Sequence, residues 1–162
     1  MRALAARATT EGRVYFTGGV TALLMNWRTT TIDIDIKMVP EQDALFRALP
    51  KLKELLEVNV EMASPDQFIP AVPMWEDRSP LISREGLLSF HHYDFYSQAL
   101  SKIERGHLRD INDVNAMLEL GLIDRPRILD YFGQIEPLLY RYPAIDPETF
   151  RLAVEKIAVP LE

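Results

Sequence analysis

Hydrophobic and polar positions alternate with a period of two along residues 28–38. One side of this segment carries three isoleucines, Ile32, Ile34 and Ile36. The other side carries Asp33 and Asp35, together with threonines. Because successive side chains of an extended chain point to opposite faces, the pattern predicts a β-strand with one buried face and one polar face.

The rest of the chain divides into a part with several predicted strands and a helical part. Short β-branched or aromatic runs predict strands at residues 14–17 and 58–62 and a hairpin over residues 81–90. Apolar residues at helical spacing predict helices at residues 2–9, 20–27, 41–56, 92–104, 110–120, 126–141 and 147–159. Three aspartates stand where helix N-caps are expected, Asp110, Asp124 and Asp146. Residues 64–80 contain four prolines and predict a loop.

This order of elements predicts an α+β fold, with a mixed sheet flanked by helices and a C-terminal helical part. We expect an α/β core over residues 1–90 and a helical part over residues 91–162. No flexible linker separates the two, so we expect the helical part to pack on the core as one compact unit.

Composition narrows the class of protein further. The chain has 162 residues, 48% of them hydrophobic and 26% charged, which is typical of a folded globular protein. It contains no cysteine, so disulfides, thiolate nucleophiles and cysteine-bound metals are excluded. The net charge of -6 argues against a broad basic face for nucleic acid. Apolar stretches are too short to span a membrane, so we expect a cytoplasmic protein with no membrane partner.

The chemistry is concentrated between residues 18 and 36. Gly18 and Gly19 separate a predicted strand from a predicted helix, and glycine lets the backbone come close to an anionic ligand such as a phosphate. Asp33 and Asp35 project from one face of the next strand. Two carboxylates so placed repel each other unless a cation lies between them, and oxygen ligands favour Mg²⁺ or Mn²⁺. The alternative interpretation is a solvated strand face beside an ordinary tight turn.

Two motifs in the observed order resemble a known family. The first is the glycine pair followed by Arg28-Thr29-Thr30-Thr31-Ile32-Asp33-Ile34-Asp35-Ile36. The second is Lys102, then Arg105, then Arg109-Asp110-Ile111-Asn112-Asp113. Together they are similar to the DNA polymerase β-type nucleotidyltransferase superfamily in its minimal bacterial forms, and to nucleotidyltransferase-like proteins related to abortive-infection toxins. The resemblance spans roughly residues 14–120 and implies a nucleotidyltransferase-like sheet.

The resemblance implies an enzyme that needs Mg²⁺ or Mn²⁺ and moves a nucleoside monophosphate from an NTP to a hydroxyl acceptor. That acceptor would be an RNA end, a protein or a small molecule. Gly18 and Gly19 would hold the triphosphate. Asp33 and Asp35 would be metal ligands and catalytic residues.

The remaining site residues also come from the resemblance. Glu61 is the candidate third metal ligand, although Glu57 and Asn59 share its face of the predicted strand. The resemblance implies that two cationic side chains, Arg28 and Lys102, offset the negative charge of the phosphates. Asp110 would orient Lys102 or the nucleotide and is counted with Lys102 as catalytic, with Asp113 as the competing choice.

Each of these assignments has an alternative. Asp110 and Asp113 also fit a helix-capping arrangement, and Lys102 also fits a solvated position on an amphipathic helix. The alternative function is a degenerate nucleotidyltransferase fold that binds a nucleotide or a cognate protein, as one half of a toxin–antitoxin-like pair. Aromatic residues in the C-terminal part fit either helix packing or self-association into a homo-oligomer.

Overall fold

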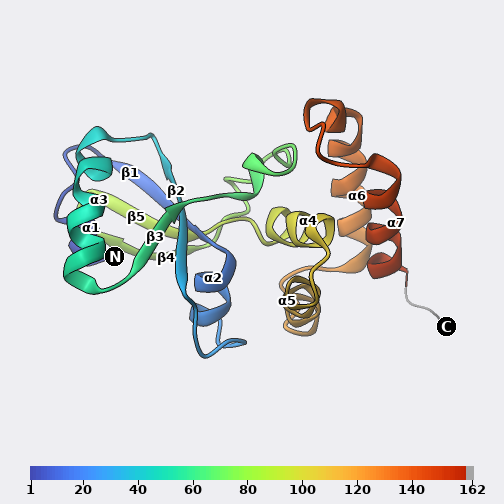
Figure 1. The fold of residues 1–162 in the computed structure, drawn as a ribbon, viewed down its shortest axis with the longest axis horizontal. Coiled ribbons are helices and arrows are strands. Elements are labelled where there is room, and N and C mark those ends of the chain that lie inside the picture. Colours follow the sequence, from blue (N-terminus) through green and yellow to red (C-terminus); the bar gives the residue numbers. More distant parts are fainter. Residues whose placement is uncertain (160–162) are drawn as a thin grey trace. The chain divides into compact units, whose positions relative to one another are not determined.

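The computed structural model describes residues 1–159 of the chain, which has an α+β fold (Figure 1). The described chain forms two compact units. The first unit consists of Met1–Ser64 and Ser79–Tyr93, and it contains the sheet. The second unit consists of Pro65–Arg78 and the chain from Asp94 onward, and it is helical. No helix among residues 1–159 is both long enough and apolar enough to cross a membrane.

The first unit is built on a mixed five-stranded sheet with the order β3-β2-β1-β5-β4. Its strands are β1 (Gly12–Thr17), β2 (Asp33–Val39), β3 (Asn59–Met62), β4 (Leu81–Glu85) and β5 (Leu88–His92). β1 pairs with β2 antiparallel and with β5 parallel. β2 pairs with β3 parallel, and β4 forms a hairpin with β5. The central strands therefore place the end of β1 beside the start of β2.

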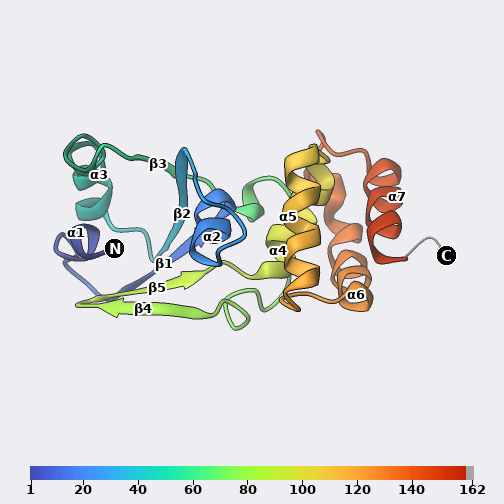
Figure 2. The same ribbon diagram turned by 90° about the horizontal axis from the view of Figure 1, so that it is seen from below.

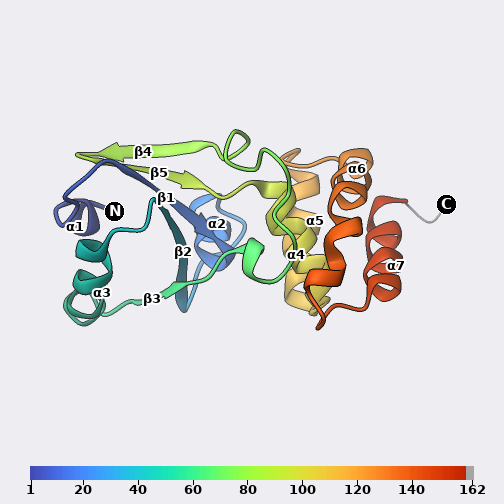
Figure 3. The same ribbon diagram turned by 90° about the horizontal axis from the view of Figure 1, so that it is seen from above.

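Helices cover one face of this sheet. The three helices of the unit are α1 (Arg2–Ala5), α2 (Gly18–Leu24) and α3 (Asp43–Leu56). Figures 2 and 3 show α1 and α3 side by side over the same face. That face carries the alternate apolar residues of the strands, among them Val14, Ile36 and Phe90, which are buried against Leu45 and Leu49 of α3. The burial of this face is the main stabilising contribution to the unit.

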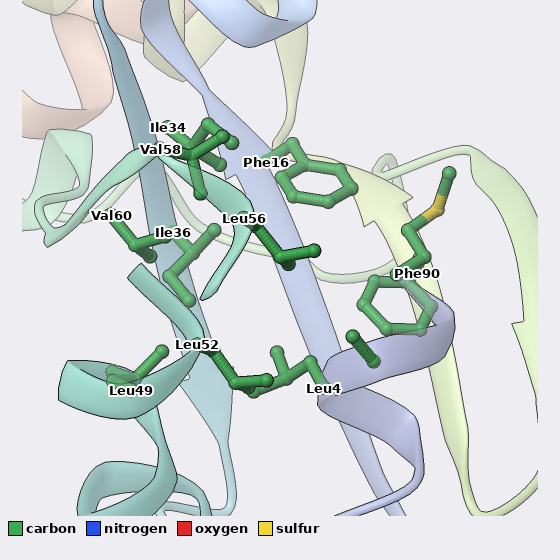
Figure 4. Close-up of a pocket in the computed structure, with 12 residues that line it drawn as sticks. Leu4, Phe16, Ile34, Ile36, Leu49, Leu52, Leu56, Val58, Val60 and Phe90 are labelled. Carbon is green, nitrogen blue, oxygen red and sulfur yellow. The ribbon is translucent and has the colours of Figure 1, made fainter. Parts of the chain in front are cut away.

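A pocket lies between α1, α3 and the sheet (Figure 4). The pocket holds about 100 Å³ and is lined by apolar side chains. They come from α1, α3 and the strands, and include Leu4, Leu52, Ile34, Val60 and Phe90. The lining includes the exposed side chains of Met1 and Leu56 as well as core residues, so the pocket is an apolar hollow that opens to the surface.

The second unit is a set of short helices, several of which have an aspartate as N-cap. They are α4 (Phe95–Arg105), α5 (Leu108–Glu119), α6 (Arg125–Ile135) and α7 (Pro147–Ala158), with 3₁₀ turns at Pro65–Gln67 and Glu136–Arg141. The side chain of Asp124 accepts a hydrogen bond from the backbone N–H of Arg127, and that of Asp146 from Thr149. Both aspartates are therefore N-caps, as predicted.

The hydrophobic pattern located most elements, and the predicted α+β class is confirmed. The predicted strand at residues 28–38 begins only at Asp33, however, and the expectation that Ile32 faces the core is wrong. Ile32 is 81% exposed, because the pairing of β2 with β3 starts at Asp33. No partner strand is paired with residues 28–32 in the described part of the chain.

Four further expectations are corrected. The predicted helix at residues 2–9 is only α1, four residues long. The helix predicted at residues 92–104 starts at Phe95, because His92 still pairs with Phe16 in the sheet. The helix predicted at residues 126–141 changes to a 3₁₀ turn at Glu136, followed by Pro137, which lacks an N–H for the α-helical hydrogen bond. Asp110 is not an N-cap, because α5 begins earlier and His107 precedes it.

Candidate active site

The glycine turn after β1 is a tight junction in which the backbone packs against side chains of neighbouring segments. Gly18 has φ +64°, a left-handed conformation that favours glycine. A Cβ at Gly18 would lie 2.5 Å from Oδ2 of Asp35. A Cβ at Gly19 would collide with Oγ1 of Thr31. A side chain at either position would force its neighbour to move, and at Gly18 the backbone conformation favours glycine as well.

Asp33 and Asp35 lie on β2 where it passes this turn. Asp35 pairs in register with Thr17, the last residue of β1, so its carboxylate stands next to Gly18. The intervening Ile34 packs against the hydrophobic core on the opposite face. The two aspartates are half-buried on one face, as the alternation predicted.

β3 brings two more polar residues to the same edge of the sheet. Asn59 lies opposite Asp33 and Glu61 opposite Asp35 in the parallel ladder. The Asn59 amide nitrogen donates to Oδ1 of Asp33 at 2.6 Å and to Oε1 of Glu61 at 2.9 Å. The exposed Glu61 carboxylate is thus linked to Asn59.

The donor chemistry of this edge suits a hard cation, although the carboxylates do not form a ready-made cage. Within residues 1–159, no group of three or more His, Cys, Asp or Glu side chains is placed to hold a metal ion. Mg²⁺ usually takes one or two carboxylates from the protein and completes its shell with water and substrate phosphates. Asp33 and Asp35 fit that requirement, and the three-carboxylate set that includes Glu61 stays a prediction.

Arg28 completes the surroundings of the turn. Its Nη1 atom lies 3.5 Å from the position that a Cβ of Gly19 would take. Thr31, on the same connection between α2 and β2, donates its hydroxyl to the backbone oxygen of Asp33 at 3.0 Å. The structure therefore brings Gly18, Gly19, Arg28 and Asp35 together.

The second predicted motif forms a buried ion cluster between α4 and α5 in the second unit. Lys102 Nζ lies 2.6 Å from Oδ2 of Asp113 and 3.3 Å from Oδ1 of Asp110. Arg105 adds two hydrogen bonds to Asp110, at 2.9 Å and 2.5 Å. The Lys102 side chain is only 5% exposed, so it is not a solvated surface lysine. Whether Lys102 and Asp110 act on a nucleotide stays a prediction.

Neighbouring charges in this cluster favour the ionised form of Asp110. Burial by itself would raise the pKa of Asp110, but its hydrogen bonds to Arg105 and the nearby charge of Lys102 outweigh this effect. The pKa of Asp110 therefore lies below its ordinary value. Buried ions are tolerated in proteins when they are paired and hydrogen-bonded in this way.

Sequence reasoning overlooked how three residues act. The sequence marks Asn59 only as an alternative to Glu61 on the same strand face, and it marks Thr31 and Arg105 only as members of the two motifs. The alternation along β3 places Asn59 on the polar face, which is a usable signal. Its hydrogen bond to Asp33 depends on strand pairing across 26 positions, and a single sequence does not reveal that pairing.

The structure has an α+β fold with a mixed sheet, and a glycine turn lies beside two carboxylates of a strand. The resemblance to nucleotidyltransferases predicts this arrangement. The comparison with protein families agrees. The family described as "Nucleotidyltransferase of unknown function (DUF6036)" matches residues 3–144, and the chain belongs to this family. No curated protein and no solved structure gives a significant match. The predicted membership in a minimal nucleotidyltransferase family is confirmed.

Proposed function

We propose that the chain transfers a nucleoside monophosphate from an NTP to a hydroxyl acceptor, with Mg²⁺ or Mn²⁺ as the metal ion. The observation that carries this proposal is the packing of Gly18 against the Asp35 carboxylate. Because Gly18 has no side chain, the Asp35 carboxylate can approach the backbone of the turn, and a metal ion held by this carboxylate would bring a phosphate close to the same backbone. Membership in a nucleotidyltransferase family supports this reading of the geometry.

Asp33 and Asp35 would hold the metal ion together with phosphate oxygens of the NTP. When bound, the metal would neutralise charge on the phosphates and polarise the phosphorus for attack. Arg28, beside the glycine turn, would balance further phosphate charge through its guanidinium group. These roles give each side chain around the turn a task in binding or orienting the triphosphate.

The proposed reaction is an in-line displacement at the α-phosphorus. The acceptor oxygen forms a bond to this phosphorus, and the bond from the phosphorus to the oxygen bridging to the β-phosphate breaks. Pyrophosphate leaves with the electron pair of that bond, and the hydroxyl proton passes to a carboxylate of the site or to water. Catalysis of this kind depends mainly on positioning and charge. We propose an RNA end, a protein or a small molecule as the acceptor.

Thermal melting with nucleotides tests the donor site directly. Wild-type protein, Asp33→Asn and the exposed-charge control Glu54→Gln are melted with ATP, GTP, CTP or UTP, with and without Mg²⁺. A nucleotide present at about 100 times its Kd adds about 2.7 kcal/mol, which corresponds to a rise of roughly 5–10 °C. We expect a Mg²⁺-dependent rise for wild type and Glu54→Gln that Asp33→Asn loses. No rise with any nucleotide would contradict the proposal.

A second function is favoured by the burial of Lys102, which is paired with Asp110 and Asp113 within the second unit. In this alternative the fold binds a nucleotide or a partner protein without transfer. Incubation with each NTP labelled at the α-phosphate, against RNA, protein and small-alcohol acceptors, separates the two functions. Label that reaches an acceptor only when Asp33 is intact would establish transfer. Nucleotide binding without any labelled acceptor would favour the alternative.

A further inference from the structure

Asn59 stands between two carboxylates and uses both of its N–H groups. Its amide nitrogen is 2.6 Å from Oδ1 of Asp33 and 2.9 Å from Oε1 of Glu61. An ionised carboxylate only accepts hydrogen bonds, so the amide must present its NH₂ group to both. The orientation of the Asn59 side chain is therefore fixed by the two acceptors together.

The pairing of the strands explains why this link is specific. Asn59 lies directly opposite Asp33 in the parallel ladder of β2 and β3, while Glu61 is two residues further along β3. Glu61 lies opposite Asp35 in the ladder, and one of its carboxylate oxygens accepts from Asn59. The contacts thus run in a chain from Glu61 through Asn59 to one oxygen of Asp33.

We propose that Asn59, oriented by Glu61, is a positioning residue for Asp33 as a metal ligand. The amide fixes Oδ1 of Asp33 and leaves its second carboxylate oxygen available to a divalent cation. Glu61 then acts through Asn59 instead of binding the metal itself. This inference rests on the proposed function, because it requires that Asp33 bind a metal ion.

The physical basis is the effect of partners on the orientation of a metal ligand. A carboxylate that is held by a hydrogen-bond donor loses less rotational freedom when it binds a cation, and removing such a partner typically weakens metal binding about 10–100-fold. The bond from Asn59 to Asp33 has an ionised acceptor, which makes it stronger than a bond between neutral groups. Loss of Asn59 should therefore weaken the binding of a metal ion even when no nucleotide is present.

The test is a titration with Mn²⁺ alone, in which electron paramagnetic resonance reports the free ion. We expect Asn59→Ala to weaken Mn²⁺ binding about tenfold or more, relative to wild type. Asp33→Asn should weaken it at least as much, because it removes the ligand. Urea unfolding of each variant shows that the fold is retained. Unchanged Mn²⁺ affinity in a folded Asn59→Ala would overturn the inference.

A pair of substitutions at Glu61 keeps the test decisive if Asn59→Ala does not fold. Glu61 is exposed, so changes there should be tolerated. Glu61→Ala removes the acceptor that orients Asn59 and should weaken Mn²⁺ binding several-fold. Glu61→Gln retains a carbonyl oxygen that can accept from Asn59, so it should restore an affinity close to that of wild type. A loss in Glu61→Gln as large as in Asp33→Asn would show that Glu61 binds the metal directly.

The outcomes distinguish this inference from the proposed function. Wild-type protein that binds no Mn²⁺ would overturn the metal site and the inference together. Binding that depends on Asp33 but is unaffected by both Asn59→Ala and Glu61→Ala would overturn the inference alone. The proposed function would then stand on Asp33 and Asp35 without a positioning amide.

Discussion

At the scale of single residues, Gly18 is the position where one added carbon atom should disturb the candidate site most. Its φ of +64° disfavours any L-residue, by about 1–2 kcal/mol. A Cβ would also lie 2.5 Å from the Asp35 carboxylate, which must then move. We therefore expect Gly18→Ala to lower the free energy of unfolding by more than 2 kcal/mol and to abolish Mg²⁺-dependent stabilisation by nucleotide. Urea unfolding and thermal melting measure the two effects.

Two other glycines separate backbone strain from the collision with Asp35. Gly86 has a similar φ of +56° but open space around it, so Gly86→Ala should show the cost of strain alone. Gly133 lies within α6 at ordinary φ, also in open space, and Gly133→Ala should stabilise the helix by up to about 1 kcal/mol. Equal losses at Gly18 and Gly86 would mean that the contact with Asp35 does not matter.

Residues on the polar face of β2 show what a single sequence can predict. The alternation of Asp33, Ile34 and Asp35 was sufficient to place both carboxylates on one face, because it depends only on the geometry of an extended chain. The same alternation placed Ile32 wrongly, because a strand ends where its partners end. Asp33 pairs with Asn59 of β3. Local periodicity does not predict which distant segments pair.

At the scale of secondary-structure elements, the ion cluster of Lys102, Asp110 and Asp113 joins α4 to α5. All three side chains are at most 8% exposed. Removing one partner of a buried ion pair leaves an uncompensated charge and typically costs about 3–5 kcal/mol. We expect Lys102→Met to lower the free energy of unfolding by this amount, measured by urea unfolding.

An exposed ion pair provides the matched control. Arg84 and Glu11 lie 3.0 Å apart, with side chains 62% and 75% exposed, and Arg84→Met should cost less than about 1 kcal/mol. A Lys102→Met variant that is as stable as wild type would show that the cluster does not join the helices. If that variant also lost nucleotide binding, the role predicted from the resemblance would be favoured instead.

The elements also show why capping was predicted well at some helices and wrongly at one. Asp124 and Asp146 precede their helices and bond to the backbone, as local sequence rules require. Asp110 has the same residue type at a plausible position, yet its carboxylate is bonded to Lys102 and Arg105. A buried ion pair between two helices is a tertiary interaction, and it decided the role of Asp110 against the local rule.

At the scale of the whole molecule, we expect the free energy of unfolding to decrease on acidification, although the net charge alone predicts the opposite. The chain has a net charge of -6 and an isoelectric point near 5.1, so acidification from pH 7 reduces its overall repulsion. His92 opposes this trend. Burial lowers the pKa of His92 below its ordinary value of 6.5, so the folded protein disfavours its protonation.

The sign of the His92 contribution follows from proton binding by the two states. Below pH 6.5 the unfolded chain takes up a proton at His92 that the folded chain resists, so stability is full above this pH and falls as the pH drops below it. We expect the urea midpoint to decrease between pH 7 and pH 5.5, and His92→Asn to reduce this dependence. His107→Gln, which alters an exposed histidine, is the control for the loss of a histidine side chain as such. If His92→Asn and wild type lost stability in parallel, another group would have to bind the proton.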